Sequence, residues 1–218
     1  MINRRHFAAT VAATSSLLAV SASQAQGNAP KEGKEYLVLG KPAPTDAPKG
    51  QVEVVEFFWY SCPHCNAFEP RLEAWVKQLP KDVSFRRAPV SFRADFEPQQ
   101  RLYFVLEALN LVDTLHAKVF YAIHVERKNL TTKDAIATWI ATQGVEKAKF
   151  LETYDSFSVA SKARRASQLQ DAYEVAGVPS IGVGGRFYTD GQQAGSMERV
   201  LQTTDFLVAE LRLSLIHI

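Results

Sequence analysis

Cysteine is almost absent from this chain. Among 218 residues there are two, Cys62 and Cys65, three positions apart. With no third cysteine, a disulfide within one chain must join these two. Closing so short a loop removes little entropy from the unfolded chain, so the bond would add little stability. A disulfide of small structural value is better explained by chemistry that forms and breaks it. The pair therefore indicates thiol redox chemistry.

Long apolar runs are also scarce. The most apolar stretch near the start, residues 7–20, is interrupted by Thr and Ser and is too short for a transmembrane helix. It follows Arg4 and Arg5 and ends in small residues at Ala25, a pattern typical of a signal peptide over residues 1–25, cleaved near Ala25. We expect export to the periplasm, by the general or the twin-arginine route. Disulfides form and persist in that oxidising compartment.

Neither basic nor acidic residues are in large excess. The chain has 25 basic and 23 acidic residues, and residues 1–25 contain two of the arginines and no acid. The mature chain is therefore formally neutral and lacks the basic balance that nucleic-acid binding requires. We expect no nucleic-acid partner. A hydrophobic content of 46% and a charged content of 22% are typical of a folded, soluble domain.

Strand patterns flank a long helical region. Apolar runs predict strands over residues 36–39, 51–59 and 83–90, and helical spacing from Phe68 to Leu79 predicts a helix between the last two. Residues 97–177 show helical periodicity throughout. Gly184-Gly185 then predicts a β-hairpin, followed by a helix from Ser196. This order predicts an α/β domain over residues 34–95 and 177–212, with an all-helical insertion over residues 96–176.

The position of the cysteine pair favours a reactive thiolate. Cys62 precedes the first turn of the predicted helix, where free N–H groups and the helix dipole stabilise negative charge. His64 adds a second stabilising group, and Pro63 fixes the backbone between the cysteines. Each unit by which the Cys62 pKa falls favours the thiolate by about 1.4 kcal/mol. Cys65, one turn further on, is expected to be buried and to act as the resolving cysteine.

A metal site is the main alternative. Zinc in proteins takes about four ligands, and only Cys62, Cys65 and His64 are local here. His116 and His124 are eight residues apart on one predicted helix, a spacing typical of a solvated or half-buried face. We predict no metal, but an exported metal-binding chaperone that uses the Cys-Pro-His-Cys motif stays open as an alternative.

Glu56 interrupts the apolar strand six residues before Cys62. It either faces solvent or the sheet edge, or it is a partly buried carboxylate that moves protons for Cys65. A buried carboxyl has a raised pKa unless it is paired, and Arg86 or Arg87 on the next strand are candidate partners.

Pro179 stands at the entrance of the hairpin strand, where a cis bond is tolerated, although trans is the default.

The run from Glu56 to Cys65, the helical insertion and Gly177-Val178-Pro179 together resemble the DsbA family of periplasmic thiol:disulfide oxidoreductases. The resemblance covers residues 34 to 212. It implies a thioredoxin fold with an all-helical domain inserted between its βαβ and ββα halves. It also implies that Cys62 is the exposed nucleophile and Cys65 the buried cysteine. By the same resemblance, Pro179 is a cis-proline and Val178 makes backbone contacts with an extended substrate.

Further implications concern the acid and the partners. Glu56 matches the family's buried acid, with Arg87 where the family carries Lys, whereas Pro70 is more like ordinary thioredoxins. The resemblance implies a protein dithiol oxidase that donates its disulfide to reduced, folding exported proteins through a mixed disulfide. It implies no cofactor beyond that disulfide, which a quinone-linked membrane protein of the DsbB type re-oxidises. A disulfide isomerase or reductase is the alternative. Those relatives carry an N-terminal dimerisation domain, so the short leader here favours a monomer.

Overall fold

The computed structural model describes residues 29–216, so the predicted signal peptide over residues 1–25 lies outside the described part. One mixed sheet holds five strands in the order β1-β5-β4-β2-β3. Only β2 and β3 are parallel, and each of the other neighbouring pairs is antiparallel. The strands are β1 (Leu37–Val38), β2 (Val52–Phe58), β3 (Val83–Pro89), β4 (Ser180–Val183) and β5 (Phe187–Asp190).

The interior strand β2 is buried at every residue because helices cover both faces of the sheet. Val52 and Val54 pack with α1 (Pro63–Val76) and α8 (Met197–Ile216). The alternate residues Val55 and Phe57 pack on the opposite face, against α6 (Phe157–Ala172). Burial on both faces explains why the strand is a nearly continuous apolar run rather than an alternating one.

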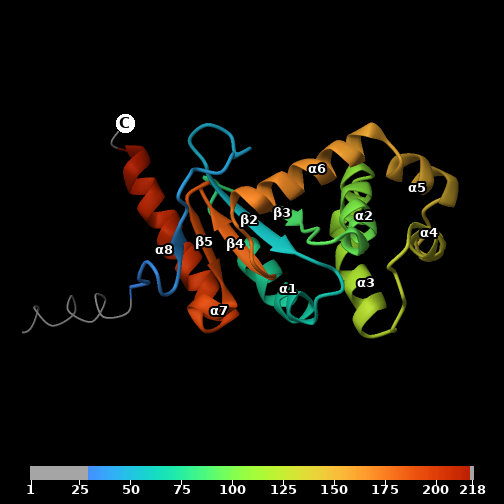
Figure 1. The fold of residues 1–218 in the computed structure, drawn as a ribbon, viewed down its shortest axis with the longest axis horizontal. Coiled ribbons are helices and arrows are strands. Elements are labelled where there is room, and N and C mark those ends of the chain that lie inside the picture. Colours follow the sequence, from blue (N-terminus) through green and yellow to red (C-terminus); the bar gives the residue numbers. More distant parts are fainter. Residues whose placement is uncertain (1–28, 217–218) are drawn as a thin grey trace, which may run out of the picture.

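A group of helices separates β3 from β4 in the chain. Figure 1 shows α2 to α5 beside one end of the sheet, with α6 running back onto it. The order confirms the prediction of strands, then helices, then a hairpin and a final helix. The insertion contains η1 (Ala94–Phe96), α2 (Glu97–Ala108), α3 (Val112–His124), α4 (Lys133–Thr142), α5 (Lys147–Tyr154) and α6. The domain boundaries proposed from the sequence stay predictions.

The hairpin between β4 and β5 turns at Gly184 and Gly185, whose φ angles are 58° and 66°. Two consecutive positive φ angles are what a tight hairpin requires, and glycine adopts them without steric cost. The sequence did not predict α7 (Gly191–Ala194), a single turn capped by the Asp190 side chain. Within residues 29–216, no helix combines the length and apolar character needed to cross a bilayer.

Candidate active site

Cys62 is the N-cap residue of α1. Its Sγ atom accepts a hydrogen bond from the backbone N–H of Cys65 at 3.4 Å. Pro63 occupies the first turn, where its missing N–H costs nothing because that group has no partner within a helix. The helix continues through Pro70. The predicted placement of Cys62 at a helix N-terminus is confirmed.

The two thiols have opposite electrostatic environments. A hydrogen bond from the Cys65 thiol and the backbone N–H groups of Cys65 and His64 lower the pKa of Cys62 to about 6, although partial burial opposes this. Burial and the interaction with Cys62 raise the pKa of Cys65 well above its ordinary range. Both cysteines are free thiols in this structure. The arrangement therefore holds one thiolate and one thiol at neutral pH.

Cys62 is less exposed than the sequence suggested. Its exposed fraction is 7%, against 0% for Cys65. Cys62 belongs to the same buried cluster as aromatic residues of the helical insertion, and its Sγ lies 3.4 Å from the Val178 carbonyl oxygen. The expectation of an exposed Cys62 is therefore wrong, because the segment around Val178 and the insertion cover most of its surface. Cys62 remains the more accessible of the pair.

The Val178–Pro179 peptide bond is cis. The Val178 carbonyl oxygen faces Cys62 Sγ, so two segments that are far apart in sequence meet at the reactive sulfur. Beside them lies a cavity of about 500 Å³. His64, Val178, Pro179 and Met197 are among the residues that line it.

Glu56 is fully buried on the α1 side of β2. It lies opposite Arg87 in the parallel register with β3, and Arg87 Nε donates to Glu56 Oε2 at 3.0 Å. Burial raises the pKa of Glu56 to about 8, even though Arg87 favours the carboxylate. Arg86, the other candidate partner, instead contacts Glu53 at 3.0 Å. The solvent-facing interpretation of Glu56 is wrong, and its burial is confirmed, whereas its role in moving protons for Cys65 stays a prediction.

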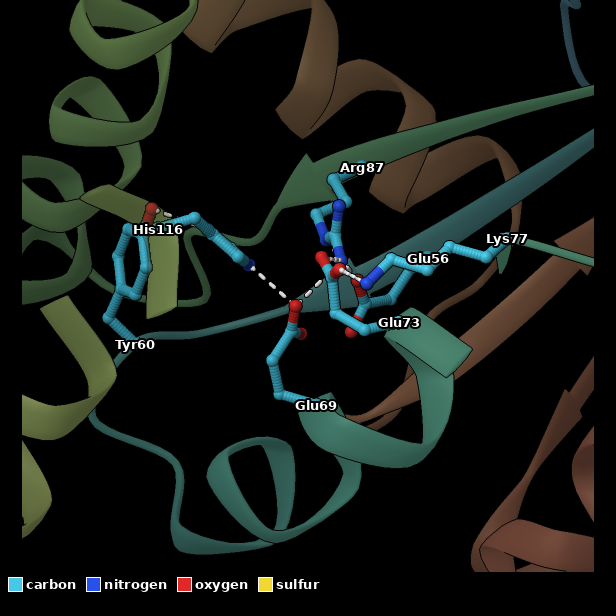
Figure 2. Close-up of polar contacts among 7 residues, drawn as sticks. All are labelled: Glu56, Tyr60, Glu69, Glu73, Lys77, Arg87 and His116. Atoms are coloured by element: carbon cyan, nitrogen blue, oxygen red, sulfur yellow. Dashed lines mark hydrogen bonds and ion pairs between the residues drawn. The ribbon is translucent and has the colours of Figure 1, made fainter. Parts of the chain in front are cut away.

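Glu56 belongs to a larger set that we call the acid cluster: Glu56, Glu69, Arg87 and His116. Arg87 Nη2 contacts Glu69 Oε1 at 2.6 Å, and His116 Nε2 lies 3.3 Å from the same oxygen. Figure 2 shows Glu69 between His116 on one side and Arg87 with Glu56 on the other. The ionised form of Glu56 raises the pKa of Cys65 further, which places the cluster within electrostatic reach of the buried thiol.

Residues 53–202 match the model of the DSBA-like thioredoxin domain family. The chain belongs to this family. Among curated relatives, the thiol:disulfide interchange protein DsbA of Burkholderia cepacia is 42% identical over 195 residues, covering 89% of this chain and 92% of that protein. The Bordetella parapertussis protein of the same name is 45% identical over 206 residues, 94% of each chain. The crystal structure of Pseudomonas aeruginosa DsbA superposes with a TM-score of 0.79 at 41% identity, covering 84% of this chain and 94% of that one.

Membership in the DSBA-like family establishes the fold and the class of activity. The fold is a thioredoxin fold with an all-helical insertion, as the sequence predicted. The activity is thiol:disulfide interchange, and the chain is a thiol:disulfide oxidoreductase. Among residues 29–216, no three His, Cys, Asp or Glu side chains gather so as to hold a metal ion. Nothing in the geometry favours the metal-binding chaperone.

The sequence placed one member of the acid cluster, His116, wrongly and did not indicate another, Glu69. His116 was expected on a solvated or half-buried face, but its exposed fraction is 3%. The error could have been avoided, because His116 shares a helix face with Val119 and Phe120, which are fully buried or nearly so. Glu69 was not singled out, although it lies four residues after Cys65 on the same face of α1.

Proposed function

We propose that this chain is a protein dithiol oxidase that donates a Cys62–Cys65 disulfide to reduced, folding exported proteins. The observation that supports the proposal is the asymmetry of the pair: the Cys62 pKa is lowered to about 6 and that of Cys65 is raised. Stabilising the Cys62 thiolate favours the reduced pair, which makes the disulfide form the stronger oxidant. A pair with a less stabilised thiolate, such as that of thioredoxin, is less oxidising and suits a reductase.

The reaction proceeds by two thiol–disulfide exchanges. A substrate thiolate attacks Cys62 Sγ in the oxidised pair, the Cys62–Cys65 bond breaks, and Cys65 leaves as a thiolate. In our proposal the Glu56 carboxyl gives its proton to that thiolate. A second substrate thiolate then attacks the substrate sulfur of the mixed disulfide, and Cys62 leaves as a stabilised thiolate. The substrate loses two electrons and the cysteine pair gains them.

Neighbouring groups have supporting roles in this proposal. His64 stabilises the Cys62 thiolate through its backbone N–H, and Pro63 holds the first turn of α1. Val178 and Pro179, which line the cavity beside Cys62, contact an extended substrate peptide through the Val178 backbone.

The cellular setting follows the same proposal. The protein works as a monomer in the periplasm, with no cofactor other than its disulfide. A quinone-linked membrane protein of the DsbB type re-oxidises the pair. The neutral balance of 23 basic and 23 acidic residues in the mature chain is consistent with unfolded protein substrates of either charge.

The test is oxidation of a reduced, unfolded protein such as ribonuclease by the oxidised enzyme. Wild type should oxidise the substrate thiols stoichiometrically and lose its own disulfide, whereas Cys62→Ser should show no reaction above the uncatalysed rate. Oxidation by Cys62→Ser at the wild-type rate would refute the assignment. In a parallel assay with scrambled ribonuclease, rearrangement faster than oxidation would favour the isomerase alternative.

A further inference from the structure

His116 is a buried titratable group that the proposed reaction does not yet use. It comes from α3 of the helical insertion, yet it contacts residues of the thioredoxin fold. Its Nδ1 atom is 2.8 Å from the Tyr60 hydroxyl, and its Nε2 atom is 3.3 Å from Glu69 Oε1. Figure 2 shows it at one end of the acid cluster. His116 therefore connects the helical insertion to Glu69 on α1 and to Tyr60 after β2.

The groups that face His116 come from every element packed against it. They are Tyr60 after β2, Glu69 and Glu73 on α1, Arg87 on β3 and Tyr103 on α2. Glu56 within β2 is linked to His116 through Arg87 and Glu69. On its own helix, His124 stacks on Phe120, and its Nε2 atom is 2.8 Å from the Tyr60 carbonyl oxygen.

Charge balance limits the states that this cluster can adopt. Glu56 and Glu69 are buried and share one cation, Arg87. With both carboxyls ionised and His116 neutral, the cluster would hold an uncompensated buried charge, which is costly. Arg87 Nη2 also donates to Glu73 Oε1 at 3.1 Å, but the Glu73 side chain is 44% exposed and lies 3.9 Å from Lys77, so solvent and that lysine screen its charge. The neutral arrangements hold one proton, either on Glu56 or on His116.

We propose that His116 is a positioning residue that gains a proton when Glu56 loses one and releases it when Glu56 is protonated again. In this way the acid cluster stays neutral while Glu56 exchanges a proton with Cys65. The inference rests on the proposed role of Glu56 and extends it to the helical insertion.

The hydrogen-bond partners of His116 suit both protonation states. The Tyr60 hydroxyl donates to Nδ1 of the neutral ring and accepts from Nδ1–H of the imidazolium, so the 2.8 Å contact survives either way. Nε2 makes no hydrogen bond within residues 29–216, but it lies 3.3 Å from Glu69 Oε1, which becomes its ion-pair partner when the ring is protonated. At the other end, Glu56 Oε1 is buried and has no hydrogen-bond partner among the described residues, which leaves it available for proton transfer.

The resting position of the proton follows from burial. Burial lowers the pKa of His116, against the attraction of Glu69, and burial raises the pKa of Glu56 to about 8. The proton therefore rests on Glu56 at neutral pH. Once Glu56 has protonated the Cys65 thiolate, the new carboxylate raises the proton affinity of His116.

Re-oxidation of the cysteine pair moves the protons in the opposite direction. It starts from the reduced molecules in which the cluster proton is on His116 rather than on Glu56. There the Cys65 thiol gives its proton to the Glu56 carboxylate, and the His116 imidazolium releases one proton to water. The Cys65 thiolate then attacks Cys62 Sγ in the mixed disulfide. The new Cys62–Cys65 bond forms, the old disulfide bond breaks, and the partner leaves as a thiolate with the electron pair.

The test is the pH profile of glutathione release from a Cys62–glutathione mixed disulfide, formed by mixing reduced protein with oxidised glutathione. This release is the attack by Cys65. His116→Gln should move the midpoint of the profile upward by about one pH unit, because Glu56 then lacks a compensating cation. The rate plateau at high pH should stay near the wild-type value. A wild-type midpoint in His116→Gln would overturn the proposal, even if the rate were lower.

Two further variants separate the possible causes. His124→Gln, on the same helix but bound to the Tyr60 carbonyl, should keep the wild-type midpoint. Glu56→Gln should remove the pH transition that Glu56 produces. If Glu56→Gln leaves the profile unchanged, the role proposed for Glu56 fails as well. If Glu56→Gln changes the profile and His116→Gln does not, only the role of His116 fails.

A measurement on folded wild-type protein covers the case in which His116→Gln does not fold. The ring ¹⁵N resonances of His116 should show partial protonation up to a higher pH in reduced wild type than in Glu56→Gln. Identical titrations in the two proteins would contradict the exchange of one proton between His116 and Glu56.

Discussion

At the residue scale, Cys62 and Cys65 show how one helical turn separates two chemical states of the same side chain. Cys62 caps α1 and receives hydrogen bonds, whereas Cys65 lies one turn inside the helix and is fully buried. The same hydrogen-bonded geometry that stabilises the thiolate also stabilises the folded state, but only where Cys62 is ionised. The pH dependence of stability therefore reports the Cys62 pKa.

Stability of the reduced protein should rise with pH relative to Cys62→Ser. The Cys62 pKa is about 6 in the folded chain, against 9.0 for an unperturbed thiol. A group with a lowered folded pKa stabilises fully above the unfolded pKa and loses this effect as pH falls through the folded pKa. Urea unfolding should show a gain of about 2 kcal/mol for wild type over Cys62→Ser between roughly pH 6 and pH 8.

The comparison with Cys62→Ser is the control for other titrating groups. Glu56, whose pKa is raised by burial, acts in the opposite direction, but it is present in both proteins. A difference between the two proteins that does not change with pH would show that Cys62 is not a stabilised thiolate.

Some site residues could be predicted from sequence and others could not, for physical reasons. Cys62, Cys65 and Pro179 stand at positions fixed by local patterns: a strand, a helix start and a hairpin entrance. Glu56 was visible as a charge in an apolar strand, but its partner was not, because Arg86 and Arg87 differ only in the face of β3 they occupy. The contact between His116 and Glu69 joins α3 to α1 and has no local sequence pattern.

At the element scale, β4 packs closely against Tyr173, the C-cap residue of α6, at Gly182, a position that the hairpin pattern did not indicate. A Cβ atom on Gly182 would lie 2.3 Å from the Tyr173 ring, far inside van der Waals contact. Tyr173 is itself fixed, since it packs edge-on against Phe57 and its hydroxyl accepts from the Gly185 N–H at 2.9 Å. The strand therefore lies flat against an aromatic ring that cannot easily move.

Gly182→Ala should destabilise the protein by about 1–3 kcal/mol, the usual cost of overpacking a core. Gly40→Ala is the matched control, because no atom lies within 4 Å of its Cβ position and its φ is not positive. Thermal or urea unfolding of both variants measures the effect. Equal stabilities of the two variants would mean that α6 moves away from the sheet without cost.

Long or strongly patterned elements were easier to predict than short or irregular ones. The apolar run of β2 and the glycine pair of the hairpin are strong local patterns, and both were confirmed. The turn α7 contains Gly191 and two glutamines, which give no apolar periodicity, so only the cap by Asp190 could have indicated it. β1 is shorter than predicted because only Leu37 and Val38 pair with β5.

At the scale of the whole molecule, the helical insertion completes the active site. Its aromatic cluster includes Phe58, Tyr60, Cys62 and Cys65 from the thioredoxin fold. Phe58 packs edge-on against His116 and Tyr103 from two different helices of the insertion. The buried environment that raises the Cys65 pKa therefore comes from both parts of the chain, and no single segment of sequence contains it.

The central claim is that the pair is a disulfide donor, and its equilibrium with glutathione tests this most directly. The fraction of reduced Cys62–Cys65 pair is measured across buffers of defined ratios of reduced to oxidised glutathione. The lowered pKa of Cys62 predicts that the pair becomes reduced in buffers far more oxidising than the potential of thioredoxin, about −270 mV. A pair that stays oxidised down to that potential would contradict the account and identify a reductase.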